Sequence, residues 1–206
     1  DPAGGYAYFG TSADPGRVVK IALGSGITPP LHVGSKTLVG VRNDLYGGVI
    51  DPVSGFAYFG TCIQDSYVMK VRLDFNYEPV IYETELEDVP FPRAAVVDTL
   101  NGYAYFGTDV LSGTDDGAVV KVDIHPARTF DQIGREVLPS EEKRLLSGVI
   151  DTTSGYAYFG SNAGDVVKIA LGAGATAPTR VGARSIGPDP LRSAVIDPGR
   201  GYAYFG

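Results

Sequence analysis

The chain has 206 residues, of which 44% are hydrophobic and 20% are charged, and its formal net charge is −7. This balance is typical of a globular protein and excludes a disordered chain. Acidic side chains outnumber basic ones by 24 to 17, which argues against nucleic acid as a partner, and no apolar run is long enough to predict a membrane span. The single cysteine, Cys62, cannot form an intrachain disulfide.

A short phrase, Gly-Tyr-Ala-Tyr-Phe-Gly, divides the chain into repeats. It stands at residues 5–10, 102–107, 155–160 and 201–206, and once as Gly-Phe-Ala-Tyr-Phe-Gly at 55–60. The intervals of 50, 47, 53 and 46 residues are typical of stacked supersecondary units such as propeller blades. We therefore predict one propeller segment, residues 1–206, with repeats 1–50, 51–97, 98–150 and 151–196 and a partial repeat 197–206. We expect it to be part of a longer array.

The first predicted strand of each unit is short and β-branched, which suits a strand that is buried on both faces. It covers residues 47–50, 94–97, 148–150 and 194–196. An Asp-(Pro/Thr)-x-x-Gly turn follows, in which aspartate accepts a turn amide and glycine supplies a positive φ. We expect this turn to pair the first strand antiparallel with the second.

The aspartates of these turns are the metal candidates, because in a closed ring their carboxylates would converge at one end of the axial channel. They are Asp51, Asp98, Asp151 and Asp197. Capping of the turn by an Asx-type bond is the interpretation that we favour, since the other residues of the turn accompany each aspartate. No cofactor is predicted.

The second predicted strand, Tyr-Ala-Tyr-Phe-Gly-Thr, has a period of two, which places both tyrosines on one face and alanine with phenylalanine on the other. Neither face is polar, so the sheet needs a neighbour on each side, as a propeller provides. We assign the repeated aromatic residues to packing rather than to base stacking or a site. They are Tyr6, Tyr8, Phe9, Tyr58, Phe59, Tyr103, Tyr105, Phe106, Tyr156, Tyr158, Phe159, Tyr202 and Tyr204.

The third predicted strand has the form Val-(Val/Met)-Lys-(Ile/Val)-x-(Leu/Ile) and covers residues 18–23, 68–73, 119–124 and 166–171. Its four lysines could form a ring of ammonium groups, but we favour stems that pack on aromatic faces. The fourth predicted strand covers residues 31–38, 80–86, 130–138 and 179–186. It is the least regular, so we expect it at the outer edge of the sheet.

Four short antiparallel strands in each unit of about 50 residues predict an all-β protein, a β-propeller with four-stranded antiparallel blades. A β-solenoid is the main alternative, and the hairpin signal of the Asp-x-x-x-Gly turn argues against it. The connections between the second and third strands vary in length, which places a variable loop on one rim.

The order of an apolar strand, Asp-Pro-x-x-Gly, an aromatic strand, Val-Val-Lys-Ile and Val-Gly resembles the YVTN-type β-propeller repeats of surface-layer and other cell-surface proteins. The resemblance spans essentially the whole chain, although the signature here is Tyr-Ala-Tyr-Phe-Gly rather than Tyr-Val-Thr-Asn. It implies a propeller fold and an extracellular or cell-surface location. It implies no specific activity.

Other motifs have simpler explanations. Residues 172–177, Gly-Ala-Gly-Ala-Thr-Ala, superficially resemble a dinucleotide loop, but no βαβ unit surrounds them. The acidic stretches 83–88 and 109–116 lack the ligand spacing of a calcium loop, and we expect a solvated surface there. The two histidines have no His-x-x-x-His or Cys partner, and no Gly-x-Ser-x-Gly elbow is present.

The sequence therefore predicts a non-enzymatic structural or protein-interaction module of a secreted or cell-surface protein, such as a building block of an extracellular fibre or coat. Its expected partners are other protein subunits or repeats of the same assembly, with a glycan as a further candidate. The alternative is a ligand-binding or hydrolytic propeller whose site lies on one rim or in the axial channel.

Overall fold

The computed structural model describes residues 1–38, 44–61, 66–75, 81–87, 89, 91–110, 116–142 and 144–206. These residues form seventeen β-strands and one turn of 3-10 helix, Ser140–Glu142 (η1). Cys62 and the middle of the predicted variable loop, residues 111–115, lie outside the described residues. Within the described chain no helix is long and apolar enough to cross a membrane.

The strands form five antiparallel sheets, each built from strands that are consecutive in the chain. The first sheet contains β1 (Tyr6–Gly10), β2 (Arg17–Ala22) and β3 (Leu31–Thr37). The second contains β4 (Leu45–Asp51), β5 (Phe56–Thr61), β6 (Tyr67–Arg72) and β7 (Ile81–Glu85). The third contains β8 (Pro92–Asp98), β9 (Tyr103–Thr108), β10 (Ala118–Asp123) and β11 (Asp131–Val137). The fourth contains β12 (Leu145–Asp151), β13 (Tyr156–Ser161), β14 (Asp165–Ala170) and β15 (Thr179–Ser185), and the fifth contains β16 (Ala194–Asp197) and β17 (Tyr202–Phe205).

The three middle sheets confirm the predicted four-stranded antiparallel unit. In each of them the strands lie in chain order, so the first predicted strand is one edge and the fourth predicted strand is the other. The repeat boundaries at Asp51, Asp98 and Asp151 fall at the ends of β4, β8 and β12. They therefore lie in the hairpin between the first and second strands of each sheet.

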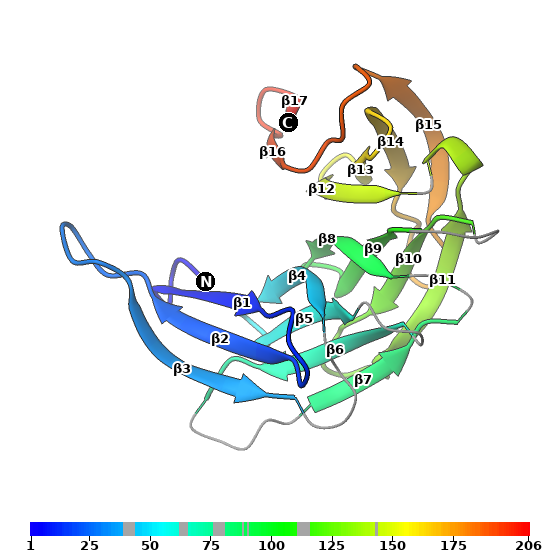
Figure 1. Cartoon of the computed structure of the whole chain (residues 1–206). Coiled ribbons are helices and arrows are strands. Elements are labelled where there is room, and N and C mark those ends of the chain that lie inside the picture. Colours follow the sequence, from blue (N-terminus) through cyan, green and yellow to red (C-terminus); the bar gives the residue numbers. More distant parts are fainter. Residues whose placement is uncertain are drawn as a thin grey trace.

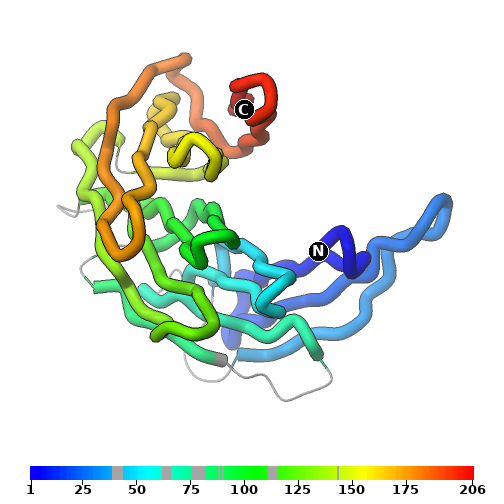
Figure 2. Tube along the Cα trace, turned by 180° about the vertical axis from the view of Figure 1, so that it is seen from behind, coloured from blue at the N-terminus to red at the C-terminus, as the bar shows by residue number. Residues whose placement is uncertain are grey.

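The five sheets follow one another around an arc (Figure 1). The edge strands β4, β8, β12 and β16 face the inside of the arc, and β3, β7, β11 and β15 run along its outside. Seen from behind, the arc is open, with the N-terminal and C-terminal sheets on either side of the gap (Figure 2). We call β4, β8, β12 and β16 the inner strands.

The hydrophobic core lies between neighbouring sheets rather than within one centre. On β5, Phe59 packs against the first sheet, where it joins Val18 and Leu38. Tyr58 of the same strand packs against the third sheet, where it joins Ala104 and Phe106. The two faces of one strand therefore bury their side chains against two different neighbours, as the alternating pattern predicts. Each further sheet stabilises its neighbour because it removes an apolar face from water.

The inner strands are longer than predicted, seven residues in β4, β8 and β12. In β12 the predicted strand began at Gly148, because the polar residue Ser147 interrupts the apolar pattern. Small residues in this part of the inner strands, such as Gly47 and Ser147, lie close to the next repeat. A Cβ on Gly47 would lie 2.6 Å from the carbonyl oxygen of Arg93, and the hydroxyl of Ser147 donates to the carbonyl of Leu191 at 2.8 Å.

The Val-Gly or Ile-Gly pairs mark a β-bulge in the outer strand. In the first, third and fourth sheets the register between the third and fourth strands shifts by one residue, which leaves Val33, Ile133 and Val181 unpaired. The second sheet has Tyr82-Glu83 at this place and no shift. The bulge bends the outer strand, and glycine follows it where the backbone needs freedom.

Candidate functional site

The repeated aromatic side chains lie at the seams between sheets. Six of them are buried, namely Tyr58, Phe59, Tyr103, Tyr105, Phe106 and Phe159. The others are half-buried or exposed, namely Tyr6, Tyr8, Phe9, Tyr156, Tyr158, Tyr202 and Tyr204. Exposure depends on the seam that a side chain faces, since on β13 Phe159 packs on the third sheet and is buried, whereas Tyr156 and Tyr158 on the other face are half-buried.

At each of the first three seams one tyrosine donates a hydrogen bond to the next sheet. The hydroxyl of Tyr58 donates to the carbonyl of Ile124 at 3.2 Å, and that of Tyr105 to the carbonyl of Leu171 at 3.0 Å. Burial raises the pKa of Tyr58 to about 12 and also raises the pKa of Tyr105. The phenols are thus held neutral as fixed donors between sheets.

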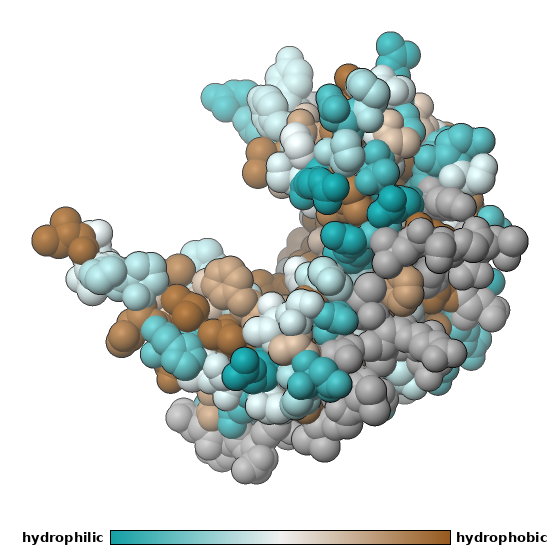
Figure 3. Space-filling model, in the orientation of Figure 1, coloured by the Kyte–Doolittle hydropathy of each residue, from teal (hydrophilic) through white to brown (hydrophobic). Residues whose placement is uncertain are grey.

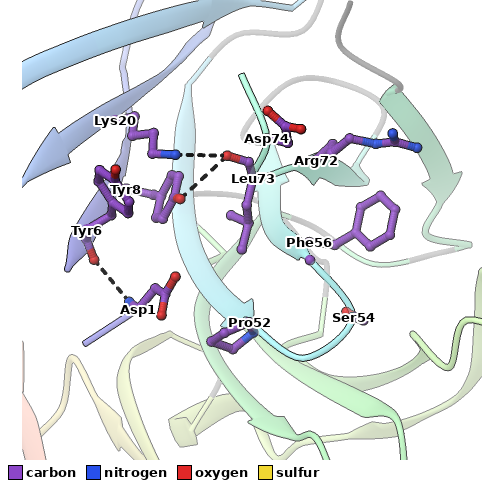
Figure 4. Close-up of a pocket in the computed structure, with 11 residues that line it drawn as sticks. Asp1, Tyr6, Tyr8, Lys20, Pro52, Ser54, Phe56, Arg72, Leu73 and Asp74 are labelled. Atoms are coloured by element: carbon purple, nitrogen blue, oxygen red, sulfur yellow. Dashed lines mark hydrogen bonds between the residues drawn. The ribbon is translucent and has the colours of Figure 1, made fainter. Parts of the chain in front are cut away.

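The lysines of the third strand pack on the aromatic strand, as predicted. The Nζ atoms of Lys20, Lys70, Lys121 and Lys168 lie 3.9, 4.4, 4.1 and 3.8 Å from the ring centroid of the first aromatic residue of that strand. Figure 4 shows how Lys20 and Tyr8 of the first sheet both point to the carbonyl of Leu73 in the second sheet. The ammonium groups of Lys20 and Lys121 therefore bond to the following sheet, and the four lysines do not line a common site.

Lys121 shows this contact in its most complete form. Its side chain is fully buried, and its Nζ atom donates to the carbonyls of Leu171 at 3.2 Å, Gly172 at 2.8 Å, Gly174 at 2.6 Å and Thr176 at 3.0 Å. The loop of residues 171–176, which we call the carbonyl cradle, surrounds the ammonium group with backbone oxygens. The motif that superficially resembles a dinucleotide loop is thus an internal ammonium site.

Two carboxylates, as well as the carbonyl cradle, stabilise the positive charge of this buried ammonium group. Burial lowers the pKa of Lys121, and the carboxylates of Asp98 and Asp123 oppose that shift. Burial likewise lowers the pKa of Lys70, against Asp123 and Asp51. The turn and strand-end carboxylates therefore supply negative charge beside the seams.

The turn aspartates accept hydrogen bonds from their own turns. Oδ1 of Asp51 accepts the N–H groups of Val53 at 3.1 Å and Ser54 at 3.3 Å, and Asp98, Asp151 and Asp197 accept equivalent N–H groups. These bonds are those that the capping interpretation predicts. Hydrogen bonds from Ser154 and Thr153 lower the pKa of Asp151. In the described ranges no group of three His, Cys, Asp or Glu side chains could hold a metal ion.

A pocket of about 450 Å³ lies between the first and second sheets, near the Asp-x-x-x-Gly turns (Figure 4). Its lining includes Tyr6, Lys20, Arg72 and Asp74. A smaller pocket of about 310 Å³ occupies the corresponding place between the third and fourth sheets, where the carbonyl cradle fills part of the space. Because the pocket recurs where sheets meet and is lined by seam residues, it is a feature of blade packing.

The opposite rim, formed by the connections between the second and third strands, carries a different arrangement, which we call the arginine cluster. Asp109, just after β9, is 1% exposed and forms salt bridges with Arg93, near the start of β8, and with Arg144, just before β12. The Arg144 Nε to Asp109 Oδ1 distance is 2.8 Å. The guanidinium of Arg93 also lies 5.1 Å from the ring centroid of Tyr46 on β4.

The position of Asp109 in the arginine cluster contradicts one prediction from the sequence. The acidic stretch 109–116 was expected to be a solvated surface, and Asp109 is instead buried beneath two guanidinium groups. Arg93 and Arg144 remain 30% and 35% exposed, and Tyr46 is 46% exposed. One buried carboxylate thus holds two cationic groups in place at a rim, beside an exposed aromatic ring. Sequence reasoning missed this cluster because its members lie on separate segments, at the start of β8, after β9 and before β12.

No family model matches this chain, and no curated protein matches it. Solved structures do match. Sqt1 of Chaetomium thermophilum, bound to the N-terminus of the ribosomal protein L10, has a TM-score of 0.65 at 12% identity, over 93% of this chain and 48% of that chain. A chain of the mitotic checkpoint complex has a TM-score of 0.71 at 8% identity, over 98% of this chain and 56% of that chain.

The fold is a β-propeller. The matched chains are propellers of the WD40 type, and identities this low concern the fold alone. This chain spans about half the length of the propeller chains that it matches.

Proposed function

We propose that this chain is a non-enzymatic protein-interaction module that binds its partner at the rim bearing the arginine cluster. The observation that carries the proposal is the pair of half-exposed guanidinium groups fixed by buried Asp109 beside Tyr46. Arginine and tyrosine dominate the energetics of protein interfaces because they combine large contact area with directed hydrogen bonds. A prepositioned guanidinium also loses little conformational freedom on binding.

The charge of the cluster indicates the chemistry of the partner. Two arginines share one carboxylate, so the cluster keeps a net positive charge on a protein whose formal net charge is −7. A carboxylate side chain of a protein partner would bind a free edge of either guanidinium group. The solved structure of Sqt1 bound to the N-terminus of the ribosomal protein L10 supports a propeller as a scaffold that binds a protein partner.

The proposal extends to cellular context. The resemblance to YVTN-type repeats supports a secreted or cell-surface protein in which the module contributes to a coat or fibre. Fractionation of the source cells tests this, with the protein expected in the surface or secreted fraction. Recovery in the cytosol alone would contradict the proposed location. It would not bear on the proposed binding surface at the arginine cluster, which the next experiment tests.

The interaction itself is tested by charge reversal. We expect the double substitution Arg93→Glu with Arg144→Glu to abolish capture of protein partners that the unmodified chain retains from its source. Arg72→Glu, on the opposite rim, serves as the matched control and should leave capture unchanged. Equal capture by all three proteins would overturn the proposed binding surface, and circular dichroism would confirm that each variant is folded.

A further inference from the structure

Lys70 on β6 lies at the seam between the second and third sheets and is only 8% exposed. The side chains of neighbouring sheets are in contact around the arc (Figure 3), so a group in a seam is enclosed by two sheets. A lysine ammonium carries three N–H donors, and its burial is costly unless these donors find acceptors. The surroundings of Lys70 therefore decide which form of its amine the seam stabilises.

The second seam lacks the bond between ammonium and carbonyl that its neighbours have. In the third seam the carbonyl of Leu171 accepts both the tyrosine hydroxyl and the ammonium group of Lys121, and the first seam has the same pair of bonds. In the second seam the corresponding carbonyl, that of Ile124, accepts the hydroxyl of Tyr58 at 3.2 Å. Within the described ranges no hydrogen bond joins the Nζ atom of Lys70 to an acceptor.

Four aromatic rings surround the ammonium group of Lys70 instead, and we call them the aromatic cage. The distances from Nζ to the ring centroids are 4.4 Å for Phe56, 5.6 Å for Phe130, 5.7 Å for Tyr82 and 5.9 Å for Tyr58. The first and last of these distances run to rings of Phe56 and Tyr58 on β5, whereas Tyr82 lies on β7 and Phe130 stands just before β11. Both sheets of the seam therefore contribute rings to the cage.

Tyr82 is a ring that the other sheets lack at this place. It lies opposite Lys70 in the register between β6 and β7. In the first, third and fourth sheets the residue opposite the lysine is a glycine, namely Gly34, Gly134 and Gly182. Those outer strands carry a β-bulge beside the glycine, and β7 has none. This departure from the repeat places an aromatic ring against the buried ammonium group.

The loop of the third sheet that corresponds to the carbonyl cradle, residues 124–129, is bound to its own sheet. The Nε atom of Arg128 lies 2.9 Å from Oδ2 of Asp123, and the same guanidinium donates to the hydroxyl of Tyr103 at 3.0 Å. Phe130 follows this loop and is the group that reaches the ammonium of the second sheet. An aromatic ring therefore stands where the fourth sheet offers backbone oxygens.

An aromatic cage fits a methylated ammonium better than a primary one. Ring faces attract positive charge but accept N–H donors only weakly, and each methyl group replaces a donor with apolar surface while the charge remains. A methyl carbon lies about 1.5 Å from its nitrogen and touches ring carbons at about 3.5 to 4.0 Å, so the longer centroid distances of 5.6 to 5.9 Å leave room for methyl groups. Acylation would instead remove the charge that the carboxylates of Asp51 and Asp123 stabilise.

We propose that Lys70 is a methylation site, and that the Nζ-methylated side chain stabilises the packing between the second and third sheets. The methyl donor is a sulfonium compound. The ammonium group first releases one proton to water, the lone pair of the neutral amine forms the new C–N bond, the C–S bond of the donor breaks, and the donor leaves as a thioether. The transfer takes place before the third sheet packs, because Phe130 of that sheet then closes the cage.

Peptide mass spectrometry of the chain isolated from its source tests the modification. We expect the peptide that contains Lys70 to carry the added mass of one or more methyl groups, with fragment ions that place them on this residue. Lys121 is the matched control, since it stands at the same position of its strand but bonds to the carbonyl cradle, and we expect it without methyl groups. Lys70 without methyl groups, or equal methylation at the two positions, would overturn the proposal.

A second measurement tests the cage without depending on the source. On a Cys62→Ser background, Lys70→Cys is alkylated in the unfolded chain with bromoethylamine or with its trimethylammonium counterpart, which gives side chains of the length of lysine that end in a primary or a trimethylated ammonium. After refolding, we expect the equilibrium constant for unfolding to be about tenfold lower for the trimethylated chain than for the primary one. A trimethylated chain that is no more stable than the primary one would contradict the cage.

Two controls belong to this measurement. Tyr82→Ala removes a ring that is 51% exposed, and it should reduce the difference between the two alkylated chains. Lys121→Cys, alkylated in the same two ways, should give the opposite order of stability, because the carbonyl cradle needs N–H donors. The same order at both positions would show that methyl groups stabilise the chain without regard to the aromatic rings, and would overturn the proposal.

Discussion

The ammonium group of Lys121 donates a hydrogen bond to the carbonyl oxygen of Gly174 at 2.6 Å, although the two residues lie 53 positions apart and on neighbouring sheets. The contact couples one repeat to the next through the backbone of a loop. A buried ammonium is costly unless its protons are all used, and here four carbonyls accept them. The seam therefore depends on a polar contact at its rim as well as on apolar packing.

Lys121→Met should destabilise the fold by about 3 kcal/mol, because the buried carbonyl of Leu171 and three partly buried carbonyls lose their donor. Chemical denaturation measures this change in the free energy of unfolding. Lys168→Met is the matched control, and it should cost less than about 1 kcal/mol since Lys168 is half-buried. Equal costs at the two positions would contradict the role of the cradle.

Tyr105→Phe removes the hydroxyl that donates to the carbonyl of Leu171 and keeps the ring in the core. We expect a loss of about 1 to 2 kcal/mol, the usual effect of leaving one buried acceptor without its donor. Tyr204→Phe, at a tyrosine that is 58% exposed, should change stability by less than about 0.5 kcal/mol. Thermal unfolding of the two variants distinguishes these outcomes.

Because the pKa of Tyr58 is raised, the stability of the fold at alkaline pH tests the packing between the second and third sheets. The folded-state pKa is about 12 and the ordinary value is 10.0, so the unfolded chain releases this proton first as pH rises. The contribution of Tyr58 to the free energy of unfolding is complete below pH 10 and is lost as pH rises through about 12. Burial lowers the pKa of Lys70 and Lys121, so these two lysines make the folded state more stable as pH rises toward their ordinary pKa. The effect of Tyr58 is therefore read from the difference in stability between the unmodified chain and a Tyr58 variant.

Tyr58→Phe should therefore lower stability at neutral pH and make the decline above pH 10 less steep than in the unmodified chain. Denaturation midpoints measured at several alkaline pH values give the two slopes. Parallel slopes would show that Tyr58 titrates normally in the folded protein.

Asp51→Asn keeps an acceptor for the N–H groups of Val53 and Ser54, so we expect it to cost less than about 0.5 kcal/mol. Asp51→Ala removes the acceptor and should cost about 1 kcal/mol. Added calcium should leave the midpoint of thermal unfolding unchanged in all three proteins. A rise in that midpoint that disappears in Asp51→Asn would instead place a cation at the turn.

The sequence predicted the repeated unit well because its signals are local. Alternation in Tyr-Ala-Tyr-Phe and the Asp-x-x-x-Gly turn identify the hairpin, and all five turn glycines have the positive φ that the turn requires. The inner strand β12 was predicted too short, since Ser147 interrupts the apolar pattern for a reason that lies in the next repeat, where its hydroxyl donates to the carbonyl of Leu191. Packing between sheets is not visible in the sequence of one repeat.

The candidate site was less predictable for the same reason. Arg93 lies in β8, Asp109 follows β9 and Arg144 precedes β12, and neither Asp109 nor Arg144 recurs at the corresponding position of another repeat. The cradle loop was noticed in the sequence, but its partner Lys121 stands about 50 residues away on another sheet. Only the arrangement of the sheets brings these groups together.

Hydroxyl-radical footprinting of the chain alone and in complex with its captured partner tests the central claim, which is that the rim with the arginine cluster binds protein. Tyr46 should lose reactivity in the complex, because it stands beside Arg93 on that rim. Tyr82, which is 51% exposed on the outer strand β7, should keep its reactivity. Unchanged reactivity of Tyr46 together with protection of Tyr82 would place the interface on the outer strands and contradict the account.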